Sequence, residues 1–134
     1  MHDLSQATRT TRDKHRALRI GPLVCWTVLV WGGRVRNVLA DDMESTERAW
    51  RLGLAGSFLV LTALVIWSSL VRRDDRPVLA LAAWSVGVWA VRWVQITFDP
   101  QWGAGFKVVH SVLALVSIGL AAWAATWVAS RGTR

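Results

Sequence analysis

Four long apolar segments, joined by short polar connections, follow a polar start of the chain. They cover residues 18–40, 49–71, 78–98 and 106–130. About 20 apolar residues in a helix span the roughly 30 Å hydrocarbon core of a bilayer, and short connections make successive helices antiparallel. The pattern therefore predicts an all-α integral membrane protein, an antiparallel four-transmembrane-helix bundle formed by residues 18–130. Residues 1–17 are predicted to form a polar, basic tail, flexible or a short surface helix, and residues 131–134 a short polar end.

The amino-acid composition agrees with a membrane location. Apolar residues make up 53% of the chain, and 10 tryptophans occur without any tyrosine. Tryptophan rings are favoured at the level of the lipid headgroups, and four lie near predicted helix ends: Trp50, Trp67, Trp102 and Trp127. Five others are predicted to pack inside the bundle: Trp31, Trp84, Trp89, Trp93 and Trp123.

The distribution of basic residues predicts the orientation of the chain. One side of the membrane receives 10 of them: Arg9, Arg12, Lys14, Arg16, Arg19, Arg72, Arg73, Arg76, Arg131 and Arg134. The other side receives 5: Arg34, Arg36, Arg48, Arg51 and Lys107. Because loops rich in Lys and Arg stay in the cytoplasm, both termini are predicted to be cytoplasmic. The use of 14 Arg against 2 Lys is typical of a high-GC bacterium, which makes a bacterial inner membrane the expected location.

The net charge of +7 has a membrane explanation as well. The basic tail is positioned to contact anionic lipid headgroups, so the bilayer, and not nucleic acid, is the expected partner of these charges. One alternative is that the first segment is a signal peptide cleaved after Ala40, which would leave three spans. Arg34 and Arg36 interrupt the approach to that cut and argue against it.

Small residues at helical spacing predict close helix packing. They recur on the fourth segment at Ser117, Ala121, Ala125 and Ala129, and on the third at Ala80, Ala83, Gly87 and Ala90. Such residues let helix backbones approach in lipid, either within one chain or between protomers. A homo-oligomer or a larger membrane complex is therefore an open alternative.

Polar side chains form two matching stripes along one face of a helix. The first segment carries Thr27, Arg34, Asn37 and Asp41, and the third carries Ser85, Arg92, Gln95 and Asp99. Both follow steps of seven, three and four residues, and His110 lies about one turn inside Phe106 on the fourth segment, on the face expected to point into the bundle. The stripes predict an outward-facing ligand-binding pocket formed by Arg34, Asn37, Arg92, Gln95 and His110, lined by Trp31, Trp89, Trp93, Asp41 and Asp99.

The predicted guest of this pocket is an anion, because guanidinium groups bind carboxylate and phosphate in a forked geometry. A small anion and an anionic lipid headgroup both fit that chemistry. The alternative is structural: Arg92 forms a buried ion pair with Asp99, Asp41 or Asp42, and Arg34 extends to the membrane surface.

Catalytic templates find little support in the sequence. His110 is the one histidine within an apolar segment, so a chain alone cannot form a histidine-rich metal site or ligate haem twice, and no cofactor is predicted. The single cysteine, Cys25, excludes an internal disulfide and is interpreted as a small buried apolar residue. The leading hypothesis is a non-enzymatic accessory or ligand-binding subunit. A small oligomeric transporter or channel, and a membrane enzyme that uses His110 on a lipid head, are the alternatives.

Overall fold

Four long helices make up the computed structural model of this protein. The structure describes residues 2–72 and 74–132, and the side chains of 10–11, 13–72 and 74–131. Helix α1 covers His2–Ala40, α2 Ser45–Trp67, α3 Arg76–Phe98 and α4 Ala104–Gly132. A short π-helix, η1, extends α2 over Ser68–Arg72. These described residues contain no strand, and Arg73 and Arg134, counted in the charge argument, lie outside them.

Three of the helices are long and apolar enough to cross a membrane. They are α2 with η1 (Ser45–Arg72), α3 (Arg76–Phe98) and α4 (Ala104–Arg131). Helix α1 is not among them, because Arg19, Arg34 and Arg36 bound or interrupt its apolar part. The structure thus supports three spans, and a fourth through α1 stays a prediction.

Helix α1 begins earlier than the apolar pattern suggests. It is continuous from His2, so the polar tail is the first part of a 39-residue helix. Pro22 consequently lies in the helix interior, where it removes one backbone hydrogen bond. Membrane helices tolerate such a residue where neighbouring groups satisfy the freed carbonyl.

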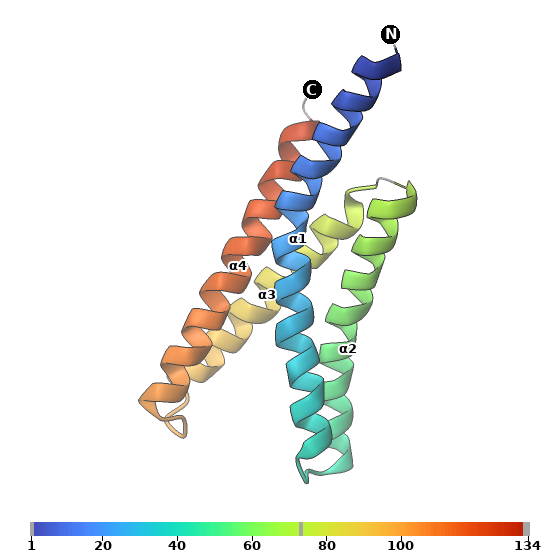
Figure 1. Ribbon diagram of the computed structural model, residues 1–134. Coiled ribbons are helices and arrows are strands. Elements are labelled where there is room, and N and C mark those ends of the chain that lie inside the picture. The colour runs from blue at the N-terminus through green and yellow to red at the C-terminus, as the bar shows by residue number, and fades with distance from the viewer. Residues whose placement is uncertain (1, 73, 133–134) are drawn as a thin grey trace.

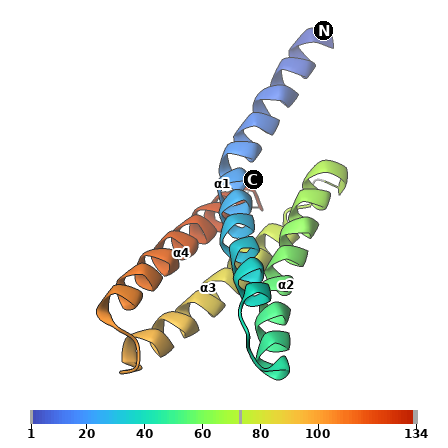
Figure 2. The same cartoon turned by 60° about the horizontal axis from the view of Figure 1, so that its bottom comes forward.

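The helices are arranged as two hairpins that part from each other. Contacts are most extensive within the α1–α2 pair and the α3–α4 pair. Figure 1 and Figure 2 show the hairpins close together near the carboxyl terminus and separated at the opposite end. We call that opposite end, which carries connections 41–44 and 99–103, the diverging end. It is the place where space opens between the hairpins.

Aromatic stacking fixes the core at the centre of the helices. Phe58 on α2 is fully buried and stacks on Trp31 of α1, with ring centroids 4.0 Å apart and an interplanar angle of 12°. The ring of Trp89 on α3 is tilted by 55° against that of Trp31, with the two ring centroids 6.2 Å apart. This cluster joins the two hairpins, because Trp31 and Phe58 belong to one hairpin and Trp89 to the other.

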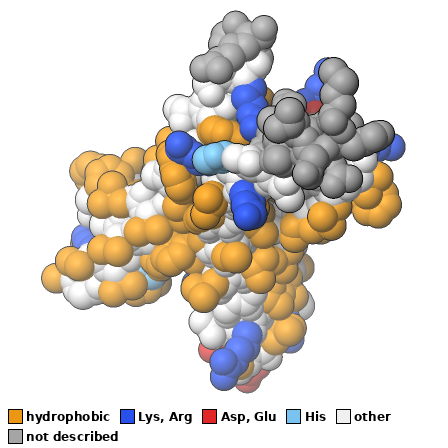
Figure 3. Space-filling model, turned by 45° about the horizontal axis from the view of Figure 1, so that its top comes forward, with side chains coloured by type: hydrophobic (Ala, Val, Ile, Leu, Met, Phe, Trp, Pro, Cys, Tyr) orange, Lys and Arg blue, Asp and Glu red, His pale blue; other side chains and the backbone are white. Residues whose placement is uncertain are grey.

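The surface around the hairpins is apolar. Leu18, Val60, Leu70, Phe98 and Leu115 are each more than half exposed, and hydrophobic side chains cover much of the face shown in Figure 3. Monomeric soluble proteins rarely carry contiguous apolar patches of that extent. The surface therefore fits a lipid environment.

Some expectations about inward-facing residues are wrong. Three of the tryptophans expected to pack inside the bundle are exposed: Trp84 at 42%, Trp93 at 43% and Trp123 at 41%. Cys25 is exposed on α1 and does not pack in the core. The third-segment stripe Ala80, Ala83, Gly87 and Ala90 is exposed within the single chain, because α3 turns Leu81, Ser85 and Trp89 inward; contact between protomers through this stripe stays a prediction. The fourth-segment stripe does reach the interior at Ser117 and Ala121, where Ser117 Oγ accepts a 2.9 Å hydrogen bond from the indole of Trp26.

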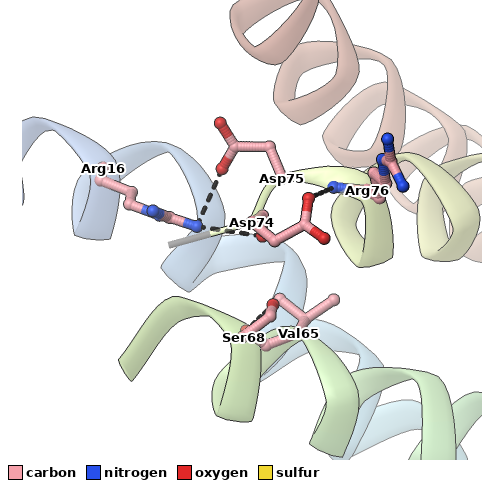
Figure 4. Close-up of polar contacts among 6 residues, drawn as sticks. All are labelled: Arg16, Val65, Ser68, Asp74, Asp75 and Arg76. Atoms are coloured by element: carbon pink, nitrogen blue, oxygen red, sulfur yellow. Dashed lines mark hydrogen bonds and ion pairs between the residues drawn. The ribbon is translucent and has the colours of Figure 1, made fainter. Parts of the chain in front are cut away.

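An ion pair ties α1 to the connection between the hairpins. Arg16 lies 2.8 Å from a carboxylate oxygen of Asp75 and donates a 3.3 Å hydrogen bond to the Asp74 carbonyl (Figure 4). Asp74 Oδ1 accepts from the backbone N–H of Arg76 at 3.0 Å, at the start of α3. The Arg16 side chain is only 13% exposed. The basic start of α1 therefore holds the two hairpins together at the end where they meet.

Candidate functional site

A cavity of about 510 Å³ lies between the hairpins near the diverging end. All four long helices contribute to its walls. Its polar wall residues are Arg34, Asn37, Glu47, Arg51, Arg92 and His110. Its apolar ones include Val30, Trp31, Leu54, Val88, Trp89 and Leu113. The volume is within the range of small-molecule sites.

Four of the polar wall residues lie at about the same distance from the diverging end, and we call them the polar layer. It contains one residue from each helix, each six residues from the helix end: Arg34 from Ala40, Arg51 from Ser45, Arg92 from Phe98 and His110 from Ala104. At 1.5 Å per residue, each lies roughly 9 Å along its helix from the diverging end. Three cationic side chains and an imidazole thus face the same space.

Below it lies an apolar layer, again with one residue from each helix. Its members are Val30, Leu54, Val88 and Leu113, which lie nine or ten residues from the same helix ends. Their distance from those ends is roughly 14–15 Å along the helix. The cavity therefore changes from cationic to apolar with depth.

The charges of the polar layer are not balanced. Arg51 pairs with Glu47 one turn away on α2. Arg34 and Arg92 are half-buried, and neither forms an ion pair with a carboxylate in the part of the chain that the structure describes. Arg34, Arg51 and Arg92 line the same cavity, and Glu47 is the one carboxylate among its described wall residues. The cavity therefore carries uncompensated positive charge.

His110 is held at the cavity by an aromatic stack. The Trp102 and Phe106 rings lie 4.2 Å apart, and the Phe106 and His110 rings 3.9 Å apart. His110 Nδ1 is 3.0 Å from the Phe106 carbonyl oxygen. A carbonyl only accepts hydrogen bonds, so Nδ1 carries the hydrogen, and Nε2 of the neutral ring is an acceptor. His110 thus offers a hydrogen-bond acceptor beside two arginines.

The structure brings together six of the ten residues predicted for the site. They line the cavity: Trp31, Arg34, Asn37, Trp89, Arg92 and His110. Of the other four, Gln95 is exposed, because the inward face of α3 continues from Trp89 to Ile96. Trp93 donates instead to Ser111 Oγ at 2.9 Å.

The two predicted acidic residues also lie away from the cavity wall. Asp99 accepts hydrogen bonds from Gln101 in the 99–103 connection. Asp41 is exposed, and its carbonyl accepts a 3.2 Å bond from Arg48. The buried ion pair offered as the alternative reading of Arg92 is absent among the described residues.

The second helix contributes cavity residues that the polar stripes do not predict. Glu47, Trp50 and Arg51 come from its first two turns. The charges of Glu47 and Arg51 cancel when charges are summed on each side of the membrane. The segment therefore resembles an ordinary polar start of a helix. Glu47 and Arg51 have the spacing of an intrahelical ion pair, and Trp50 lies between them. This combination is the sequence signal that could have identified the start of α2 as part of the cavity.

Comparison with known proteins adds no assignment. The chain matches no protein-family model, and comparison with curated proteins and with solved structures finds no significant similarity. The function is therefore argued from the cavity.

Proposed function

We propose that this protein is a non-enzymatic ligand-binding or accessory subunit of a bacterial inner membrane, with an anion site in the cavity between its hairpins. In this proposal all four long helices cross the membrane, both termini are cytoplasmic, and the diverging end faces outward. The excess of basic residues at the opposite end supports this orientation.

The packing of α1 supports its placement in the membrane. It lies along α2, which is apolar enough to span a bilayer, and buries Leu23 and Val38 almost completely. The other side of α1 exposes Val28 and Leu29. A helix that is apolar on both its packed and its exposed faces fits a bilayer.

Single cysteines in a Cys25→Ser background test this topology. The four cysteine positions are exposed residues on either side of the apolar parts of α1 and α3: Lys14, Asp42, Arg76 and Gln101. With a membrane-impermeant maleimide on intact cells, we expect labelling at positions 42 and 101, and labelling at 14 and 76 only after permeabilisation. Labelling of 14 and 42 from the same side would show that α1 does not cross. The reverse pattern would invert the orientation.

One structural feature of the cavity supports an anion site. Arg34 and Arg92 project into one cavity at the same level, half-buried and without a carboxylate partner among the described residues. Unpaired cations at that depth cost free energy, and an anion bound between them recovers it. Forked hydrogen bonds from two guanidinium groups suit a phosphate or carboxylate.

Replacing both arginines tests the site. We expect Arg34→Gln/Arg92→Gln to weaken binding of phosphate-bearing probes by at least about 30-fold, because loss of even one such charge contact costs about 2 kcal/mol or more. The probes are inorganic phosphate, glycerol phosphate and phosphatidylglycerol, and the readout is the thermal midpoint of the purified protein in neutral detergent. Arg36→Gln is the matched control, since Arg36 is exposed on α1 and lies off the cavity wall. Failure of all three probes to bind the native chain, or an equal loss in the control, would overturn the proposal.

A further inference from the structure

The order of the two layers in the cavity resembles the order of groups in a lipid. The polar layer presents Arg34 and Arg92 nearer the diverging end, and the apolar layer follows roughly 5 Å deeper along the helices. A free anion would use only the first of these layers. A molecule with a charged head and an apolar chain would use both.

The cavity also reaches the side of the protein. Leu29 and Trp50 both line it, yet they are 68% and 72% exposed. Leu29 lies eleven residues before Ala40, the last residue of α1, which places it roughly 16 Å from the diverging end and deeper than the arginines. In a membrane-spanning protein, a wall residue exposed at that depth faces acyl chains. The opening is therefore available to molecules within the bilayer.

The level of the polar layer agrees with the position of lipid headgroups. The span formed by α2 and η1 contains 28 residues, which is roughly 42 Å of helix and close to the full thickness of a bilayer with its headgroups. Roughly 9 Å inside its start, the polar layer lies near the boundary between headgroups and hydrocarbon. Long arginine side chains at this level extend toward the surface, where lipid phosphates lie.

We infer that the ligand of this cavity is an anionic lipid that enters sideways from the leaflet at the diverging end. The inference rests on the proposed anion site and names its ligand class. The lipid phosphate contacts Arg34 and Arg92, and one acyl chain lies along Val30, Leu54, Val88 and Leu113. Because Nδ1 of His110 faces the Phe106 carbonyl, Nε2 is the ring nitrogen left to hydrogen-bond a lipid head such as glycerol phosphate.

A four-probe titration of the purified full chain in neutral detergent, read by native mass spectrometry, tests this inference. The probes are inorganic phosphate, glycerol phosphate, dioctanoyl phosphatidylglycerol and dioctanoyl phosphatidylcholine. We expect phosphatidylglycerol to bind at least about 100-fold more tightly than glycerol phosphate, because only the lipid fills the apolar layer. We expect phosphatidylcholine to bind at least about 10-fold more weakly than phosphatidylglycerol, because its choline cation meets Arg34 and Arg92.

Two variants distinguish binding of the acyl chain at the apolar layer from nonspecific partition of the lipid into detergent. Leu54→Gln should weaken phosphatidylglycerol binding about 5-fold or more and leave glycerol phosphate binding unchanged. Leu64→Gln is the matched control, since Leu64 lies on the same helix, is 47% exposed and is outside the cavity. Equal losses in the two variants would overturn the inference.

The remaining outcomes distinguish the inference from the proposed function. If glycerol phosphate or inorganic phosphate binds as tightly as the lipid and depends on Arg34 and Arg92, the ligand is a soluble anion and only the inference fails. If no probe binds in a manner that depends on these arginines, both fail. If the two lipids bind equally, the site does not select charge, and the inference fails.

Discussion

Arg92→Glu should abolish anion binding and at the same time raise the thermal midpoint of the ligand-free protein. The substitution places a carboxylate in the wall of the cavity that Arg34 also lines. It replaces a repulsive pair by an attractive one in a half-buried cavity. We expect binding of phosphatidylglycerol to fall by at least about 100-fold and the midpoint to rise by roughly 4 °C, equivalent to about 1 kcal/mol.

The opposite signs of these two effects make the test specific. A variant that simply misfolds would lose both binding and stability. Arg36→Glu is the matched control, because it introduces the same charge change at an exposed position of α1 and should alter neither quantity. In Arg34→Glu/Arg92→Glu the two carboxylates repel each other, so the gain in stability should disappear. A stable Arg92→Glu protein that still binds the anion would exclude Arg92 from the site.

Phe58→Ala should produce the largest loss of stability, about 3 kcal/mol or more. Phe58 is fully buried and stacks on Trp31, and its ring centroid lies 6.2 Å from that of Trp84. Removing its ring leaves a cavity beneath the aromatic cluster that joins the hairpins. The thermal midpoint in detergent and the near-ultraviolet circular dichroism of the tryptophans are the measurements.

Phe98→Ala provides the control for this variant. Phe98 is 79% exposed at the end of α3. Its removal should therefore change the free energy of unfolding, as judged from the thermal midpoint, by less than about 0.5 kcal/mol. Because Trp31 also lines the cavity, Phe58→Ala should weaken ligand binding as a secondary effect. Equal midpoints for the two variants would contradict the assignment of Phe58 to the core.

The number and type of the long helices follow from the sequence, because long apolar runs separated by short polar connections predict helices. Four runs predict four helices, and the structure has four long ones. The residues that approach one another at the cavity were also partly predictable. A charged side chain such as Arg34 or Arg92 inside an apolar run is conspicuous, and helical spacing places it on a face with its polar neighbours.

The inward faces of the helices were harder to predict for a physical reason. In a soluble protein the buried side of a helix is apolar and the exposed side is polar, whereas in a membrane both are apolar. Gln95 and Ile96 illustrate the problem, because the polar stripe favours Gln95 while α3 buries Ile96. The same lack of contrast misplaced Cys25 and the exposed tryptophans Trp84, Trp93 and Trp123. Glu47 and Arg51 were overlooked because their charges neutralise each other.

The divergence of the two hairpins gives the protein a wedge shape (Figure 1). In the membrane placement proposed above, this wedge would occupy more area in one leaflet than in the other, so the lateral pressure of the bilayer would act unequally on its two ends. Any movement that brings the hairpins together reduces the area at the wide end and the volume between them. The capacity of the cavity is therefore mechanically linked to the packing and curvature of the leaflet that surrounds it.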